Sequence, residues 1–372
     1  MKKAILFLLL TVSGYYMMSQ TIHSAYGTGE MMFDFSNYRS VSVKQNADTG
    51  YIIAGGMEYS NAVAMKLDKN GDTIWTKKYS EGSNEVFFNT TYPAYDDGYI
   101  FGGFHISTDS NMNIIFVKTD MDGNISWSKN IDRGSDDYGL DIIETADSGY
   151  AQTGWTWMAG SGIDGCLFKV DKNGNSVITK VYSADNDDYI YKIRQNSDKG
   201  YIMAGWTNSN AGYNKDILLI RTDANGDTLW AKDLGNSDDS KAFSAKQTLD
   251  GGFIICGFAQ NGSNGNDILL VKTDPNGTIE WSKLYGRSSA DKGYDVIQSE
   301  DTGYVVAGVT SRGYDYGLMM KTDSKGNLLS AYTLGGPFNE DGFMEIIESK
   351  NGGYVFGGYT MSFGPQMMSA SP

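Results

Sequence analysis

Histidine and cysteine are scarce in this chain, and their scarcity removes several kinds of site. The 372 residues include 2 histidines, His23 and His105, and 2 cysteines, Cys166 and Cys256. A histidine-based metal site or a serine–histidine–aspartate triad requires side chains that the chain hardly supplies. Both cysteines lie in apolar, strand-like segments of separate units, so we expect buried thiols rather than a disulfide. The sequence therefore predicts no catalytic residue, no metal ligand and no cofactor.

Basic residues are also outnumbered, with 30 Lys and Arg against 45 Asp and Glu and a formal net charge of −15. An acidic surface of this kind repels phosphate backbones and anionic lipids, and it keeps an exported protein soluble. We therefore expect no nucleic-acid partner. We also expect the protein to be a monomer.

Long apolar runs are limited to the start of the chain. Two lysines precede the apolar segment Ala4–Val12, which is too short to span a membrane, and a polar stretch through Ser19 and Gln20 follows it. This order predicts a signal peptide over residues 1–20, with cleavage near Ser19 or Gln20. The mature chain is then exported, to be secreted, periplasmic or held at the cell surface, without membrane insertion.

A repeated unit occupies most of the chain. Each copy opens with Gly-Tyr, once Gly-Phe, before a short apolar segment that ends in another glycine, and copies are about 51 residues apart. They begin at Gly50, Gly98, Gly149, Gly200, Gly252, Gly303 and Gly353. Around Gly252, turn-forming residues separate strand-like segments at 242–248, 253–259, 267–273 and 278–286. Four antiparallel strands form one blade of a β-propeller, so we predict an all-β, seven-bladed β-propeller over residues 21–372.

The two ends of the repeat are incomplete in a complementary way. The copy that begins at Gly353 contains no fourth strand, whereas Ile22–Tyr26 matches the end of a fourth strand such as the one before Gly286. We expect Ile22–Tyr26 to supply the outer strand of the last blade and so close the ring, because a free strand edge promotes aggregation.

Residues that recur in the copies favour a structural explanation. The turn between the third and fourth strands reads Asp-x-Asn/Asp/Lys-Gly, as in Asp68 to Gly71. It predicts a hairpin turn rather than a calcium loop, because no copy supplies the bidentate acid. A tryptophan recurs on the fourth strand, where we expect it to pack between blades, at Trp75, Trp127, Trp230 and Trp281.

Two charged positions also recur, an acid before the first strand and a Lys or Arg near the end of the third. We expect them to tie the strands of each blade together. The alternative is that a ring of the acids binds cations near the central axis. The acids are Glu85, Asp137, Asp188, Asp239, Asp291 and Asp341.

The departures from the repeat fall on one face of the predicted disc. Loops between the second and third strands, and between blades, vary from copy to copy, which is how a binding face is built on a rigid scaffold. We predict a ligand site from large side chains on this variable face: Phe104, His105, Trp155, Trp157, Trp206, Tyr213, Phe258, Arg312, Tyr314 and Tyr359. Aromatic faces beside polar groups suit a sugar ring, while the structural alternative is that these rings pack blade against blade.

The pattern DGGYIxxG, DILLVKTDxNG and WxKxYG, best matched by Asp250 to Gly286, resembles a family of exported bacterial β-propeller repeat proteins frequent in Bacteroidetes. The resemblance covers about residues 21–372 and implies the propeller fold. Members look like surface or secreted binding proteins, often ending in a sorting domain for type IX secretion, whereas this chain stops at Pro372 without that tail. The family has no agreed catalytic residues to transfer.

Together these features predict a secreted, non-catalytic binding or scaffold propeller. Its ligand is expected to be a glycan or a protein on the variable face. The alternative from another class is a carbohydrate-active enzyme, either a polysaccharide lyase or a glycosidase, since acids are abundant even though no spacing singles out a catalytic pair.

Overall fold

The computed structural model describes the strand-rich part of the chain and two N-terminal strands. The described residues are 4–13, 16–18, 41–56, 62–80, 85–160, 162–182, 186–208, 215–234, 239–262, 265–286, 290–336, 340–350 and 352–360. Within these residues, no helix has the length and apolar character needed to cross a membrane.

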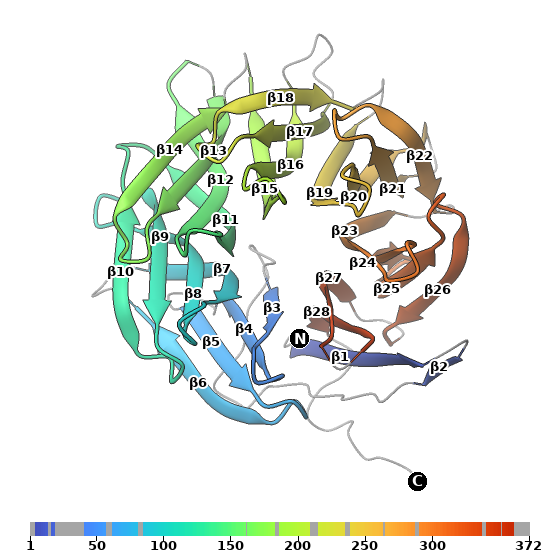
Figure 1. The fold of residues 1–372 in the computed structure, drawn as a ribbon, viewed down its shortest axis with the longest axis horizontal. Helices are drawn as coiled ribbons and strands as arrows, with labels where there is room; N and C mark the ends of the chain where they lie inside the picture. Colours follow the sequence, from blue (N-terminus) through green and yellow to red (C-terminus); the bar gives the residue numbers. More distant parts are fainter. Residues whose placement is uncertain are drawn as a thin grey trace.

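Six antiparallel sheets, each made from four consecutive strands, stand around a central axis (Figure 1). We call them blades 1 to 6 in chain order. Blades 1 to 3 contain β3 (Val41–Gln45), β4 (Tyr51–Gly56), β5 (Ala62–Leu67), β6 (Thr73–Tyr79), β7 (Glu85–Pro93), β8 (Tyr99–Ile106), β9 (Met112–Thr119), β10 (Ile125–Ile131), β11 (Asp137–Glu144), β12 (Tyr150–Met158), β13 (Gly162–Val170) and β14 (Ser176–Tyr182). Blades 4 to 6 contain β15 (Asp188–Gln195), β16 (Tyr201–Thr207), β17 (Asp216–Thr222), β18 (Thr228–Asp233), β19 (Ser240–Gln247), β20 (Phe253–Gln260), β21 (Asn266–Thr273), β22 (Ile279–Tyr285), β23 (Asp291–Gln298), β24 (Tyr304–Ser311), β25 (Asp315–Thr322) and β26 (Leu328–Leu334).

The last copy of the repeat differs from the other six. Its strands β27 (Asp341–Glu348) and β28 (Tyr354–Thr360) form a sheet with β1 (Ala4–Ser13) and β2 (Tyr16–Met18), in the order β2-β1-β28-β27. The prediction of seven blades is therefore corrected to six of consecutive strands, because the last copy has only two described strands of its own. The segment expected to complete it, Ile22–Tyr26, lies outside the described residues, and β1 and β2 fall within the segment assigned to a signal peptide.

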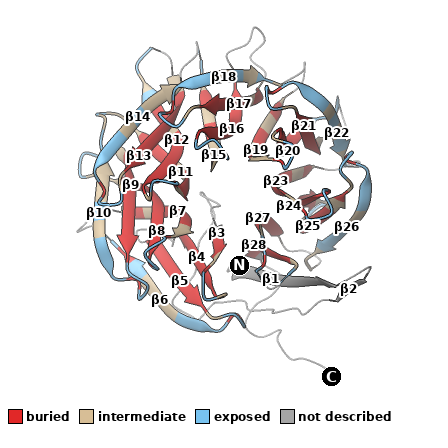
Figure 2. Cartoon of the chain, viewed as in Figure 1, coloured by how far each residue is buried: buried red, intermediate tan, exposed pale blue. Residues whose placement is uncertain are grey.

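Burial follows the radial position of each strand. First strands lie next to the axis and fourth strands at the rim, where β6, β10, β14, β18, β22 and β26 are the exposed part of each blade (Figures 1 and 2). Middle strands such as β5 are buried along their whole length, because neighbouring blades cover both faces of the sheet. Cys166 and Cys256 lie in such strands, buried and unpaired, as predicted.

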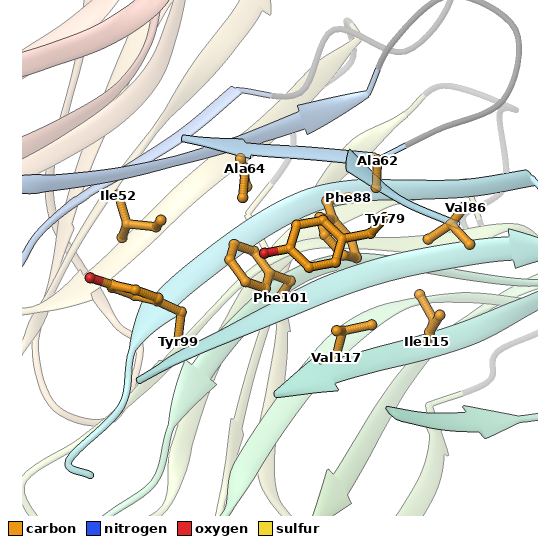
Figure 3. Packing of buried hydrophobic residues seen from close by; sticks show 11 residues of the cluster. Ile52, Ala62, Ala64, Tyr79, Val86, Phe88, Tyr99, Phe101, Ile115 and Val117 are labelled. Carbon is orange, nitrogen blue, oxygen red and sulfur yellow. The ribbon is translucent and has the colours of Figure 1, made fainter. Parts of the chain in front are cut away.

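Neighbouring blades are joined by apolar packing. Phe88 and Phe101 belong to a cluster that joins blades 1 and 2 (Figure 3). At the rim, the Trp75 ring lies 5.9 Å from the Tyr99 ring, and its Nε1 donates to the Met121 carbonyl oxygen at 3.2 Å. Equivalent contacts to the next blade confirm that the recurring tryptophans pack between blades, at Trp127, Trp230 and Trp281.

One face of the disc is built from uniform tight turns. In the first turn between a third and a fourth strand, Asp68 Oδ1 accepts the backbone N–H groups of Asn70 and Asp72, both at 2.8 Å, and Gly71 has a φ of 87°. The left-handed conformation is costly for residues with a Cβ, which explains the glycine. The predicted hairpin turn is confirmed here and at Gly123, Gly174, Gly226, Gly277 and Gly326.

The recurring cation of the third strand pairs with an acid other than the one considered from the sequence. Lys118 Nζ lies 2.7 Å from a carboxylate oxygen of Asp96, and Lys272 Nζ lies 2.9 Å from one of Asp250. These acids belong to the turns that precede the Gly-Tyr pairs. Each bridge therefore ties a third strand to the turn between the first and second strands, with further pairs at Lys66–Asp48, Lys169–Asp147, Arg221–Asp198 and Lys321–Asp301.

Candidate functional site

A β-bulge in the first strands brings one polar position to the axis. In β11 the pairing with β12 shifts between Gly139 and Asp141, and the same shift occurs in the other first strands from β7 onward. A bulge adds a residue and re-aims the side chains that follow it. The residues just after the bulge are Thr90, Asp141, Lys192, Ser244, Asp295 and Glu345.

Charged residues at and near this position form a buried network, which we call the axial ion cluster. Its members are Lys44, Asp141, Lys192, Arg194, Lys246, Asp295 and Glu345, whose side chains are at most 20% exposed. Arg194 Nη1 lies 2.6 Å from Asp141, and Lys246 Nζ lies 3.1 Å from Asp295. Lys192 Nζ lies 3.5 Å from Glu345, so a blade 4 side chain reaches β27 across the axis.

The carboxylates of the cluster also serve the backbone. Glu345 Oε2 accepts the N–H of Val43 at 2.7 Å, and Asp295 Oδ2 accepts the N–H of Ile346 at 3.2 Å. Each first strand has one edge without a neighbouring strand, and a buried N–H without a partner is costly. The cluster therefore joins first strands of different blades and satisfies their inner edges.

Burial and mutual charge shift the pKa values in the cluster. Burial alone would raise the pKa of Asp295, but Lys246, Lys192 and Arg194 outweigh it and hold this pKa well below its usual value. Burial lowers the pKa of Lys246 to about 8, and Asp295 only partly offsets this effect. The cluster contains four cations and three acids, and this surplus of positive charge disfavours protonation of both Asp295 and Lys246.

The acids predicted before the first strands lie apart from this cluster. Asp137, Asp188, Asp291 and Asp341 are buried at the start of first strands, whereas Asp239 precedes β19, and Ser240 takes the equivalent position. Asp239 Oδ1 accepts the N–H of Lys215 at 2.9 Å and so joins blades 4 and 5. Burial raises the pKa of Asp137.

Aromatic rings form a ladder on the variable side of the first and second strands. The ring of Phe104 stacks at 4.1 Å on Tyr138, which stacks at 5.3 Å on Trp155. Tyr189 continues the ladder, 5.9 Å from Trp155 and 4.5 Å from Trp206. The structure therefore brings three predicted site residues of blades 2, 3 and 4 into one continuous array.

Three other predicted residues are buried. These are His105, Phe258 and Tyr359. Tyr359 packs in the core cluster that includes Val43, and Phe258 contacts Phe243. Their side chains are therefore not exposed on the variable face.

Four predicted residues are at least partly exposed. Trp155 is half-buried, and Trp157, 49% exposed, ends the same strand in blade 3. Arg312 and Tyr314 are exposed on the hairpin of blade 6, which is separate from Trp157 in the ring (Figure 1). Tyr213 lies outside the described residues.

Three hollows lie on the opposite face, where the tight turns are. Their volumes are about 820, 480 and 710 Å³, and Glu348 lines all of them. Lys44 lines one and Lys246 another, so cluster residues form part of their walls. Sequence reasoning placed no site on this face and missed the axial ion cluster. The available signal was a charge inside an apolar first strand, as at Glu345.

Comparisons with known proteins bear on the fold. No protein-family model matches the chain, and no curated protein matches it. A lectin, BP39L from Burkholderia pseudomallei, is similar in structure with a TM-score of 0.54 at 8% identity, over 87% of this chain and 90% of that one. The fold is a β-propeller.

Two further solved structures are similar to this chain. An α-L-arabinanase of Penicillium chrysogenum, in complex with arabinobiose, has a TM-score of 0.50 at 10% identity and covers 82% of this chain and 93% of that one. A puromycin hydrolase has a TM-score of 0.49 at 11% identity and covers 86% of this chain and 58% of that one. At 8 and 10% identity, the similarity to the lectin and the arabinanase shows the fold alone.

Proposed function

We propose that this β-propeller is a non-catalytic binding protein whose ligand is a glycan held on the variable face of blades 3 and 4. The observation that carries the proposal is the ladder Tyr138, Trp155, Tyr189 and Trp206. The exposed Trp157 lies two residues after Trp155 on β12, so the two side chains stand on the same face of the strand. The half-buried rings of Trp155 and Tyr189 and the exposed ring of Trp157 offer apolar faces of the kind that a sugar ring packs against.

The choice of glycan over protein rests on the shape of this surface. Its rings are fixed by stacking against one another, so little conformational entropy is lost on binding a small flat group. A stable protein interface needs a larger contiguous patch, and the exposed apolar side chains of the described residues are scattered over the rim and turns. A protein ligand is the competing hypothesis that the experiment has to refute.

A glycan array compares wild type with two single variants. Trp157→Ala removes an exposed ring on the variable face, whereas Tyr95→Ala removes an exposed ring, 77% exposed, in a turn of the opposite face. We expect Trp157→Ala to weaken binding about tenfold and Tyr95→Ala to leave it unchanged. If only Tyr95→Ala weakens glycan binding, the ligand site is instead the hollow that Tyr95 lines.

The enzyme alternative has one specific observation in its favour. Asp137 is buried at the start of β11, and burial raises its pKa, which is a property of general acids. Incubation of the protein with a polysaccharide panel, followed by assays for reducing ends and unsaturated products, tests this alternative. Product formation that disappears in Asp137→Asn would replace the binding proposal.

We also propose that the chain is exported after cleavage near Ser19 or Gln20 as a monomeric member of the Bacteroidetes-type propeller family. Removal of residues 1–20 would take away β1, so the edge of β28 would need another strand. We propose that Ile22–Tyr26 fills this place and completes a seventh blade, because an open edge invites aggregation. N-terminal sequencing of the exported protein tests the cleavage. Deletion of residues 21–28 should then lower the melting temperature or cause aggregation, and an unchanged melt would refute the closure.

A further inference from the structure

Lysines replace aromatic residues along one register position of the first strands. In blades 2, 3 and 4 the first-strand residue opposite the second-strand ring is itself aromatic: Phe87 opposite Phe104, Tyr138 opposite Trp155 and Tyr189 opposite Trp206. In blades 5 and 6 the same position is Lys241 and Lys292. The variable side of the first strands therefore changes from aromatic to cationic halfway around the ring.

A third lysine joins them from the preceding blade. Lys215 lies just before β17, and its carbonyl oxygen accepts the N–H of Ser240 at 2.6 Å, which fixes its backbone beside β19. The Nζ atoms of Lys215 and Lys241 lie 5.2 and 4.5 Å from the Trp206 ring centroid. Lys292 Nζ lies 5.5 Å from the Phe258 centroid. We call Lys215, Lys241, Lys292, Trp206 and Phe258 the lysine–aromatic surface.

These ammonium groups form no ion pair with a described residue. Among the described residues, no carboxylate oxygen lies within 4.0 Å of the Nζ atom of Lys215, Lys241 or Lys292. By contrast, the third-strand lysines each meet an aspartate. Burial, together with repulsion from Lys215 and Lys292, lowers the pKa of Lys241 to about 8, although Asp239 acts in the opposite direction. Half-buried cations that repel one another are stabilised by a bound anion.

The position of this surface says what kind of anion fits. Trp206 belongs both to the lysine–aromatic surface and to the ladder, and Tyr189 links it to the half-buried Trp155. An extended ligand can therefore meet ammonium groups in blades 4 to 6 and an aromatic face in blade 3. A chain of ring-shaped units that carries negative charges presents both features.

We propose that the lysine–aromatic surface binds the carboxylate or sulfate groups of an acidic polysaccharide, while a neighbouring sugar ring lies against Trp155. This inference rests on the proposed function and adds the charge of the ligand. It also accounts for the local excess of cations in a chain whose net charge of −15 would otherwise repel such a polymer.

The test uses the mature protein and four probes, measured by isothermal titration calorimetry. The probes are polygalacturonate, the fully methyl-esterified form of the same polymer, a sulfated galactan and poly-glutamate. The variant is Lys241→Met/Lys292→Met, which removes charge and keeps side-chain length. The control is Lys283→Met, because Lys283 also lies over a tryptophan, 6.0 Å from the Trp281 centroid, but at the rim.

We expect an acidic polymer to bind at least about tenfold more tightly than the ester, and the double variant to lose about tenfold or more. Lys283→Met should bind as wild type does, and added salt should weaken binding. Preference for the carboxylate or for the sulfate identifies the anion, and either supports the proposal. Unchanged melting of the double variant shows that the loss is not unfolding.

Other results overturn the inference in distinguishable ways. If the ester binds as tightly as polygalacturonate, or if the double variant binds as wild type does, the protein is still a glycan-binding protein and only its charge preference is refuted. If no polysaccharide binds but poly-glutamate does, the surface recognises acidic protein segments, and both the inference and the proposed function fail.

Discussion

Glu345 is the residue whose loss should affect stability most sharply. Its side chain is 3% exposed, its Oε1 meets Lys44, and Lys192 Nζ lies 3.5 Å away. Its Oε2 accepts the N–H of Val43 at 2.7 Å. Glu345→Gln keeps the volume and one acceptor oxygen for Val43, so the change removes little except the charge. Two buried cations then lose a partner in a cluster that already has a positive surplus.

The expected magnitude follows from the burial of these charges. Removing one partner of a buried ion pair costs roughly 3–5 kcal/mol, because the other charge is left uncompensated. At ~2.1 cal/mol/K per residue, a folded chain of ~350 residues unfolds with an entropy of ~0.7 kcal/mol/K, so the melting temperature should fall by about 4–7 °C. The double variant Lys44→Met/Glu345→Gln should restore part of the loss, since Lys44 is then no longer a buried charge without its carboxylate.

Thermal and urea unfolding, followed by circular dichroism, measure the effect. The matched control is Glu348→Gln on the same strand, because Glu348 is exposed and is not a member of the axial ion cluster. We expect the control to change the free energy of unfolding by less than about 0.5 kcal/mol. If Glu345→Gln melts within about 1 °C of Glu348→Gln, the cluster contributes no stability and the reasoning is refuted.

Three further predictions concern the same architecture. Lys246→Met should maintain the free energy of unfolding at pH 7 or raise it by up to about 3 kcal/mol, because burial lowers the pKa of Lys246 from 10.5 to about 8 and makes its charged form costly. A loss of stability comparable to that of Glu345→Gln would contradict the surplus of positive charge. The pKa values of Asp141, Asp295 and Glu345 are lowered in the folded state, so their stabilisation is complete above about pH 5 and is lost as the pH falls below it. The melting temperature should therefore decline less steeply between pH 7 and 3 in Asp295→Asn than in wild type. Urea unfolding should show a larger loss of stability for Gly123→Ala than for Gly313→Ala. Both glycines have a positive φ, but only a Cβ at Gly123 would meet a ring, 2.9 Å from Trp75. Equal losses would mean that backbone strain alone matters.

The sequence predicts well whatever every blade repeats. Three features recur in step with the Gly-Tyr pairs: the fourth-strand tryptophans, the Asp-x-x-Gly turns and the boundaries of the four strands. An assignment made in one copy therefore supports the same assignment in the other copies. Contacts between a residue and its neighbour one blade away are also fixed by the repeat, as for Trp75 and Tyr99. These features account for the confirmed part of the fold.

The candidate site could be predicted only in part, because exposure depends on the neighbours of a residue rather than on its type. Trp206 and Trp157 look alike in the sequence as tryptophans near the same loops. In the structure Trp206 is 5% exposed between Tyr189 and the lysines, whereas Trp157 is 49% exposed. The second-strand position faces the next blade, so the large residues there are used mostly for packing. Lys241 lies over Trp206 and Lys292 over Phe258, and each of these two lysines belongs to the blade after that of its ring.

The axial ion cluster shows why a comparison of the repeat copies does not reveal that their charges balance. The position after the bulge reads Thr90, Asp141, Lys192, Ser244, Asp295 and Glu345, which looks like variation without a rule when the copies are aligned. An apolar residue in every copy would fill the axis but would leave inner-edge N–H groups such as those of Val43 and Ile346 without acceptors. Carboxylates supply the acceptors, and their burial then requires cations nearby. The requirement applies to the whole ring and not to each blade, so Lys192 of blade 4 can compensate Glu345 across the axis. The first strands that carry Lys241 and Lys292 are therefore held in place by charges from several blades, which gives the variable face a rigid base.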